Sequence, residues 1–283
     1  MTPIQTKQGS VVASELLYEQ LQLQVENVNV KIDLICRDGE LAPMVFLHGF
    51  GSTKEDYIDI AYYPSFAGRP FVAFDLPGCG ETSCDDLSAI SIPFLVNTAR
   101  AVLEYKNIDK FHLLGHSMGG LTALMLAHQY PSSVLSFINI KGNLASEDCF
   151  LSRQIITYSS GGENNTDAFF EEFIQRTRRS PSASSALYGI GLRHKVRVGA
   201  VSGIFRSMVH LSDTADLLGK FLALPFPCAF MYGTEYSSLS YLSHIEANGV
   251  KLAEIPYSGH FPMYSNPVAM WKYITSFYER NKF

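Results

Sequence analysis

Short runs of apolar residues recur along the chain and predict buried β-strands. These runs lie at Val45, Phe71, Phe111, Val134–Ile140, Ala229–Tyr232 and Lys251–Ile255. Helix-like segments separate successive runs, and strands that are buried on both faces of a sheet have this continuous apolar composition. The alternation predicts an α/β fold in which helices cover both faces of a mostly parallel sheet.

Residues 21–36 follow a different pattern, because apolar and polar residues alternate through most of this segment. Such alternation places successive side chains on opposite faces of a strand. We expect one or two antiparallel strands here, at the edge of the sheet.

The interval between Ile140 and Cys228 is far longer than the roughly twelve residues that a parallel crossover needs. We therefore expect a helical cap at residues 143–205, inserted into a core formed by residues 1–142 and 206–283. The cap segment contains several aromatic residues, which would suit a mostly apolar pocket.

Composition excludes several classes of protein. The 283 residues carry a formal net charge of −5 without a basic stripe, so nucleic acid is not an expected partner. Residues 1–10 lack the apolar segment of a signal peptide, and no apolar run is long enough to span a bilayer. Five dispersed cysteines fit free thiols in a reducing compartment. We expect a cytoplasmic protein with no membrane contact.

The segment Gly115-His116-Ser117-Met118-Gly119 lies between a predicted strand and a predicted helix, as in a nucleophile elbow. Its glycines allow a tight turn that leaves the Ser117 hydroxyl exposed at the tip. A serine hydroxyl is a poor nucleophile at neutral pH, so it needs a base and donors that hold an oxyanion. The N–H group of Met118 would be one such donor.

Two further loops supply the missing groups. Residues 43–52 form an apolar strand that leads into a glycine-flanked loop, where the N–H group of Phe50 would be the second oxyanion donor. Residues 258–262 follow a short predicted strand late in the chain and place His260 on a loop. His260 is the expected base.

Taken in this order, the oxyanion loop, the serine turn and the histidine loop resemble the α/β-hydrolase superfamily across nearly the whole chain. Residues 75–80 resemble the Asp-x-Pro-Gly-x-Gly turn of such hydrolases. The resemblance implies an α/β-hydrolase fold, with a mostly parallel eight-stranded sheet, flanking helices and an inserted helical cap. We expect Asp75, His48 and His116 to hold loops rather than to take part in catalysis.

The acid of the triad is the irregular feature. In many relatives it follows the seventh strand in a Gly-x-x-Asp motif, but this chain has Tyr236 at that position, with Glu235 one residue earlier. Other relatives take it from the end of the sixth strand, where this chain has Lys141. We predict Glu235 as the acid, paired with Lys141 across neighbouring strand ends. The alternative candidates for the acid are Glu147, Asp148 and Asp213.

A second hypothesis is that Lys141 stands where an acid would complete the triad and so weakens activity. The main prediction is a serine hydrolase that cleaves a small carboxylic ester or lactone, apolar or aromatic, through an acyl-enzyme on Ser117. Two alternatives stay open, namely a weakly active or inactive ligand-binding homologue, and a biosynthetic acyltransferase or carbon–carbon bond hydrolase. No cofactor or metal is expected, since neither ligand spacing nor a dinucleotide loop is present. A homodimer stays an open alternative.

Overall fold

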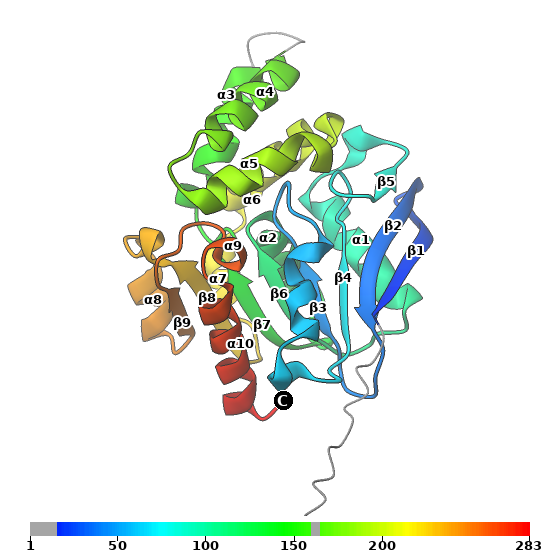
Figure 1. The fold of residues 1–283 in the computed structure, drawn as a ribbon, viewed down its shortest axis with the longest axis vertical. Coiled ribbons are helices and arrows are strands. Elements are labelled where there is room, and N and C mark those ends of the chain that lie inside the picture. Colours follow the sequence, from blue (N-terminus) through cyan, green and yellow to red (C-terminus); the bar gives the residue numbers. More distant parts are fainter. Residues whose placement is uncertain (1–15, 160–164) are drawn as a thin grey trace, which may run out of the picture.

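The computed structural model describes residues 16–159 and 165–283, so the prediction for residues 1–10 lies outside the described residues. Within these ranges nine strands form one sheet (Figure 1). The strands are β1 (Leu17–Val25), β2 (Val28–Arg37), β3 (Met44–Leu47), β4 (Phe71–Phe74), β5 (Ser83–Cys84), β6 (Phe111–His116), β7 (Val134–Ile140), β8 (Cys228–Gly233) and β9 (Lys251–Ile255).

The strand order is β1-β2-β4-β3-β6-β7-β8-β9, and β5 pairs with β2. Strand β2 pairs antiparallel with β1, β4 and β5, whereas the pairs from β4 through β9 are parallel. The predicted eight-stranded sheet is confirmed along this path, and the antiparallel edge strands are β1 and β2. Strand β5 is an addition of two residues, too short to give a periodic pattern.

Helices pack on both faces of the sheet (Figure 1). Helices α1 (Ile92–Tyr105), α2 (Met118–Gln129) and α7 (Leu217–Leu222) pack together on one face. The 3₁₀ segment η1 (Lys54–Ala61) and α10 (Pro267–Asn281) lie on the other. There Phe46 of β3 stacks on Tyr57 and meets the edge of Trp271, and all three side chains are almost fully buried. These three aromatic rings belong to the core on the face covered by η1 and α10.

Of the five α-helices between β7 and β8 in the described ranges, the first four form the upper part of the molecule in Figure 1, beyond the carboxyl ends of the central strands. They are α3 (Phe150–Ser159), α4 (Asn165–Arg178), α5 (Ala183–Lys195) and α6 (Val201–Thr214), preceded by the 3₁₀ segment η4 (Ser146–Cys149). The expected boundary at residue 205 falls inside α6. The division into core and cap stays a prediction.

The C-terminal part contains α8 (Leu242–Ala247) and α9 (Pro262–Ser265), and shorter 3₁₀ segments are η2 (Pro64–Phe66), η3 (Leu87–Ala89), η5 (Val198–Ala200) and η6 (Thr234–Tyr236). None of the helices in the described ranges has both the length and the apolar composition that crossing a membrane requires.

The buried Lys54 ammonium links the segment after β3 to Asp33 of β2 and to Asp75, which follows β4. The Lys54 ammonium lies 2.9 Å from Asp75 Oδ2 and 3.0 Å from Asp33 Oδ1. Asp75 is fully buried and also accepts backbone N–H groups of Lys54 and Glu81, each at 2.8 Å. The charged carboxylate is therefore fully engaged, which is consistent with the structural role expected for Asp75.

Replacing Lys54 with methionine should leave the Asp75 carboxylate buried without its cation. We expect the free energy of unfolding to fall by about 3–5 kcal/mol, as when one partner of a buried pair is removed. Urea denaturation followed by circular dichroism measures this loss. The control is Glu55→Gln, because Glu55 contacts the same lysine from an exposed position and should contribute less than about 1 kcal/mol. Equal losses in the two variants would contradict the structural role of the pair.

Candidate active site

Ser117 occupies a sharp turn between β6 and α2 with φ 51° and ψ −118°, a conformation that non-glycine residues rarely adopt. Close packing on both sides enforces it. A Cβ on Gly119 would lie 2.2 Å from Leu47 O, and one on Gly115 would lie 2.4 Å from Gly119 O. Only glycine lets helix α2 approach strands β3 and β6 this closely, so the turn is a nucleophile elbow.

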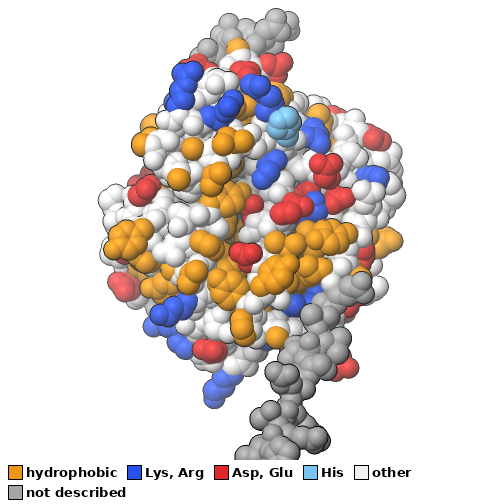
Figure 2. Space-filling model, viewed as in Figure 1, with side chains coloured by type: hydrophobic (Ala, Val, Ile, Leu, Met, Phe, Trp, Pro, Cys, Tyr) orange, Lys and Arg blue, Asp and Glu red, His pale blue; other side chains and the backbone are white. Residues whose placement is uncertain are grey.

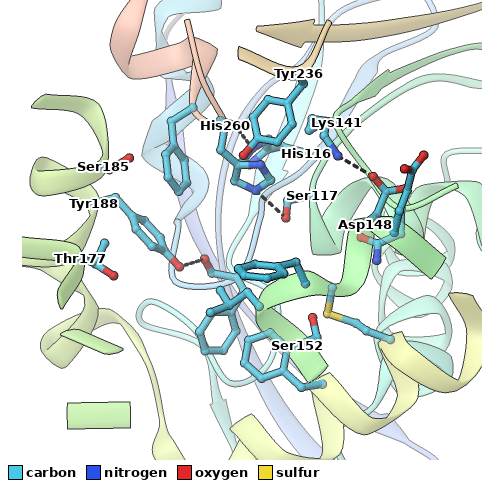
Figure 3. Close-up of a pocket in the computed structure, with 18 of the residues that line it drawn as sticks. His116, Ser117, Lys141, Asp148, Ser152, Thr177, Ser185, Tyr188, Tyr236 and His260 are labelled. Atoms are coloured by element: carbon cyan, nitrogen blue, oxygen red, sulfur yellow. Dashed lines mark hydrogen bonds and ion pairs between the residues drawn. The ribbon is translucent and has the colours of Figure 1, made fainter. Parts of the chain in front are cut away.

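The structure brings Ser117 and His260 together across 143 positions of sequence. His260 Nε2 lies 3.0 Å from Ser117 Oγ, within hydrogen-bond distance (Figure 3). His260 comes from the loop between β9 and α9, as the sequence predicts. The contact is the one that a serine nucleophile and its general base require.

His116 anchors the histidine loop from below. Its Nε2–H donates to the carbonyl oxygen of His260 over 2.7 Å. Because a carbonyl only accepts, this nitrogen carries a proton. Burial lowers the pKa of His116 to about 4, so it stays neutral at physiological pH. His116 therefore holds the loop of His260 as a neutral ring.

The pKa of His260 also lies well below its ordinary value of 6.5. Burial is the largest cause, followed by repulsion from His116, which acts only when that ring is itself protonated, and by the charge of Lys141. The ring keeps partial exposure toward the cavity. A neutral imidazole at physiological pH can accept a proton, which suits it to the role of base.

The predicted oxyanion loop runs beside the nucleophile. A Cβ on Gly49 would lie 3.3 Å from Ser117 Cβ. His48 fixes this loop, because its Nδ1–H donates to Gly49 O over 2.7 Å and its Nε2 accepts the Leu76 N–H over 2.8 Å. Phe50 follows directly and is buried. His48 is thus fully hydrogen-bonded as a loop support.

Tyr188 of α5 reaches down to the same loop. Its hydroxyl donates to Phe50 O over 2.7 Å, and both residues are buried. Burial raises the pKa of Tyr188 well above its usual range, which keeps the phenol a donor. On the other side of Ser117, Met118 is the first residue of α2, where backbone N–H groups lack intrahelical partners. The assignment of Phe50 and Met118 as oxyanion donors stays a prediction.

The expected ion pair between Lys141 and Glu235 is wrong. The Lys141 ammonium instead lies 2.5 Å from Asp148 Oδ1, and the two side chains are 5 % and 1 % exposed. Glu235 is exposed, and its carboxylate lies against the backbone of Gly259. Among the described residues it forms no hydrogen bond with His260.

The alternative candidates for the acid are also engaged elsewhere. Asp148 accepts the Tyr241 hydroxyl and two backbone N–H groups besides Lys141. Glu147 accepts from Ser240, and Asp213 pairs with Arg153 on the surface. In the part of the chain that the structure describes, His260 therefore has no hydrogen bond to a carboxylate, and Glu235 as the acid stays a prediction.

A cavity of about 450 Å³ opens above Ser117 (Figure 3). Most of its wall is apolar, and this part includes Phe50, Leu151, Phe173, Tyr188, Phe205, Met208 and Phe261. Lys141, Asn143 and Asp148 line a polar end. Within residues 16–159 and 165–283 no group of three His, Cys, Asp or Glu side chains could hold a metal ion.

Comparisons with known proteins agree with this architecture. Residues 42–189, more than half of the chain, match the family model described as alpha/beta hydrolase fold. Among solved structures, an N-acyl homoserine lactonase variant superposes with a TM-score of 0.72 at 17% identity, covering 94% of this chain and 97% of that one. A thermophilic esterase from Thermogutta terrifontis superposes with a TM-score of 0.72 at 17% identity, covering 93% and 98%. At such identity these likenesses show the fold alone.

Curated relatives match over shorter stretches. The chain is 35% identical over 118 residues to the pimeloyl-[acyl-carrier protein] methyl ester esterase of Aeromonas hydrophila, covering 41% of this chain and 42% of that protein. It is 39% identical over 95 residues to the dihydrolipoyllysine-residue acetyltransferase component of the acetoin cleaving system of Pseudomonas putida, covering 33% and 25%. The chain thus spans less than half the length of these relatives.

Histidine titration tests the electrostatics of the site. We expect the His260 ring to become protonated only at lower pH than an ordinary histidine, because burial and the Lys141 charge disfavour imidazolium. NMR of histidine-labelled protein reports the titration, and a His260→Gln sample assigns the signal. A midpoint at or above 6.5 would contradict this description of the site.

Proposed function

Because the chain belongs to the alpha/beta hydrolase fold family, we propose that it is a serine hydrolase that cleaves a small carboxylic ester or lactone. The observation that carries the proposal is the 3.0 Å contact between Ser117 Oγ and His260 Nε2 at the elbow, beneath a mostly apolar cavity. A nucleophile, a neutral base and an enclosed binding space then occur at one place.

In the proposed mechanism Ser117 Oγ attacks the carbonyl carbon of the substrate, and His260 Nε2 takes the hydroxyl proton. The backbone N–H groups of Phe50 and Met118 hold the oxygen that becomes negative. The imidazolium then gives its proton to the leaving oxygen as the carbonyl–oxygen bond breaks, which leaves an ester on Ser117. Water, deprotonated by the same imidazole, releases the acid and restores the serine.

The cavity supports the choice of substrate class. Its volume of about 450 Å³ suits a small molecule, and its aromatic and aliphatic wall favours an apolar or aromatic group. Relatives and structural neighbours named as a methyl ester esterase and an N-acyl homoserine lactonase act on bonds of this kind. The polar end beside Lys141 would accommodate the more hydrated part of the substrate.

One observation favours a second candidate, a homologue that has slow catalytic turnover or only binds a ligand. In a complete triad a carboxylate stabilises the imidazolium that forms during the reaction. Within the described residues His260 lacks that hydrogen bond, and the nearby Lys141 charge disfavours the imidazolium. The protein would then bind and acylate but release product slowly.

A fluorophosphonate probe should label Ser117, because the serine oxygen displaces fluoride from phosphorus while His260 takes the proton. Peptide mass spectrometry locates the adduct, and Ser117→Ala is the control that must stay unlabelled. Turnover of short-chain aryl esters measured on the same sample separates the two candidates. Labelling with turnover supports the hydrolase, and labelling without turnover supports the second candidate. A folded protein that stays unlabelled contradicts both.

Tyr188→Phe should lower kcat/KM for such esters, because the carbonyl of Phe50 loses its hydrogen bond and the oxyanion loop is held less firmly. A lost hydrogen bond of about 0.5–1.5 kcal/mol corresponds to a decrease of up to about tenfold. Steady-state kinetics measures it. The matched control is Tyr232→Phe, which removes a hydroxyl that donates to Glu254 on the neighbouring strand rather than to the oxyanion loop. An equal decrease in both variants would argue against a specific role for Tyr188.

A further inference from the structure

The two positions at which related hydrolases carry the triad acid are filled here by side chains that contact each other. Lys141 follows β7 and Tyr236 ends η6, directly after β8, and these strands are paired in the sheet. The Lys141 ammonium lies 4.8 Å from the centroid of the Tyr236 ring, a cation–π contact. Figure 3 shows both side chains beside His260.

The cation in this contact is fixed in place. Lys141 has a left-handed backbone with φ 48°, and its N–H donates to Met231 O over 2.8 Å. Its ammonium is held by Asp148, which Tyr241 and the backbone hold in turn. A lysine that is 5 % exposed and paired in this way has little freedom to swing toward a substrate.

Tyr236 in turn contacts the imidazole. Its ring meets the ring of His260 edge-on, with centroids 5.9 Å apart and planes at 60°. Phe261 lies at 5.0 Å and 88°, and His116 at 4.9 Å and 53°. Three rings therefore enclose the base and leave it facing Ser117. Such contacts fix the orientation of an imidazole by packing. The acid of a complete triad fixes that orientation by a hydrogen bond.

We propose that Tyr236, held by Lys141, is the positioning residue of this site and provides the orientation of His260 that a hydrogen-bonded carboxylate provides in a complete triad. The inference rests on the function proposed above. The ring of Tyr236 keeps His260 aimed at Ser117, and the phenolic hydroxyl is not required for this. The arrangement provides orientation without negative charge, so the imidazolium formed during reaction gains no carboxylate partner.

A consequence for pH follows from the charges around the base. The titratable and charged groups that face His260 from the surrounding elements are His116 from β6, Lys141 after β7 with its partner Asp148, and Glu235 and Tyr236 from η6. The Lys141 charge disfavours protonation of His260 and so lowers its pKa. Removing that charge should therefore raise the pKa of His260. The acid limb, which is the decrease in the rate of Ser117 labelling at low pH, should then move to higher pH.

The test is the rate at which a fluorophosphonate labels Ser117, measured from pH 4 to 8, a range that spans the ordinary histidine pKa of about 6.5. We expect Tyr236→Ala to slow labelling by about ten- to a hundredfold, as for a misplaced catalytic group. Tyr236→Phe should restore most of that loss, since it keeps the ring. Tyr236→Leu is measured as well, because it fills the volume if the alanine variant is unstable. Tyr105→Ala, exposed at the end of α1, is the control and should match the unchanged protein.

Lys141→Met keeps the length of the side chain and removes its charge, and the Asp148 carboxylate that it leaves without a cation acts on His260 in the same direction. We expect it to raise the midpoint of the acid limb of labelling by about half a pH unit or more, a shift that a purely structural role would not produce. The inference is overturned if Tyr236→Phe is labelled as slowly as Tyr236→Ala. It is also overturned if Tyr236→Leu keeps the original labelling rate and Lys141→Met keeps the original midpoint. An unchanged protein that takes up no probe at any pH would instead refute the proposed function.

Discussion

The backbone at Ser117 is the constraint on which the rest of the site depends. A non-glycine residue in this conformation costs about 1–3 kcal/mol and persists only where the surroundings enforce it. Here the surroundings are glycines at 115 and 119, which let α2 pack against β3 and β6, and the hydrogen bond from Ser117 N–H to Ile140 O. The strain is offset by core packing, and it directs the hydroxyl out of the sheet toward His260.

Much of the fold and part of the site follow from local sequence. The buried strands, the elbow and the loop of His260 each depend on residues adjacent in the chain, so their patterns are visible without coordinates. The partner of Lys141 could not be predicted, because it depends on the left-handed backbone at Lys141 and on how η4 folds back to present Asp148. The Tyr188 contact with Phe50 joins positions 138 apart, and no local pattern signals it.

The electrostatics of the site favour an uncharged base. His48, His116 and His260 all lie among protein atoms that lower their pKa values, and His116 and His48 are held by hydrogen bonds suited to neutral rings. Lys141 lies beside them and is paired with Asp148 at 2.5 Å. The surroundings that favour a neutral His260 also make its protonated form costly, and in the proposed reaction this would limit the rate.

Helices α5 and α6 and the loop of Phe50 form one packed unit. Phe50 is held by the Tyr188 hydroxyl at its carbonyl, while its ring lies 4.6 Å from the ring of Phe205 in α6. Tyr188 also stacks on Phe261, the residue after His260, with centroids 4.4 Å apart. A displacement of α5 would thus disturb the loop of Phe50 and the loop of His260 together. The geometry of the site therefore depends on the segment above it, and in the proposed reaction a substrate that fits beneath α5 without displacing it would meet groups that are already aligned.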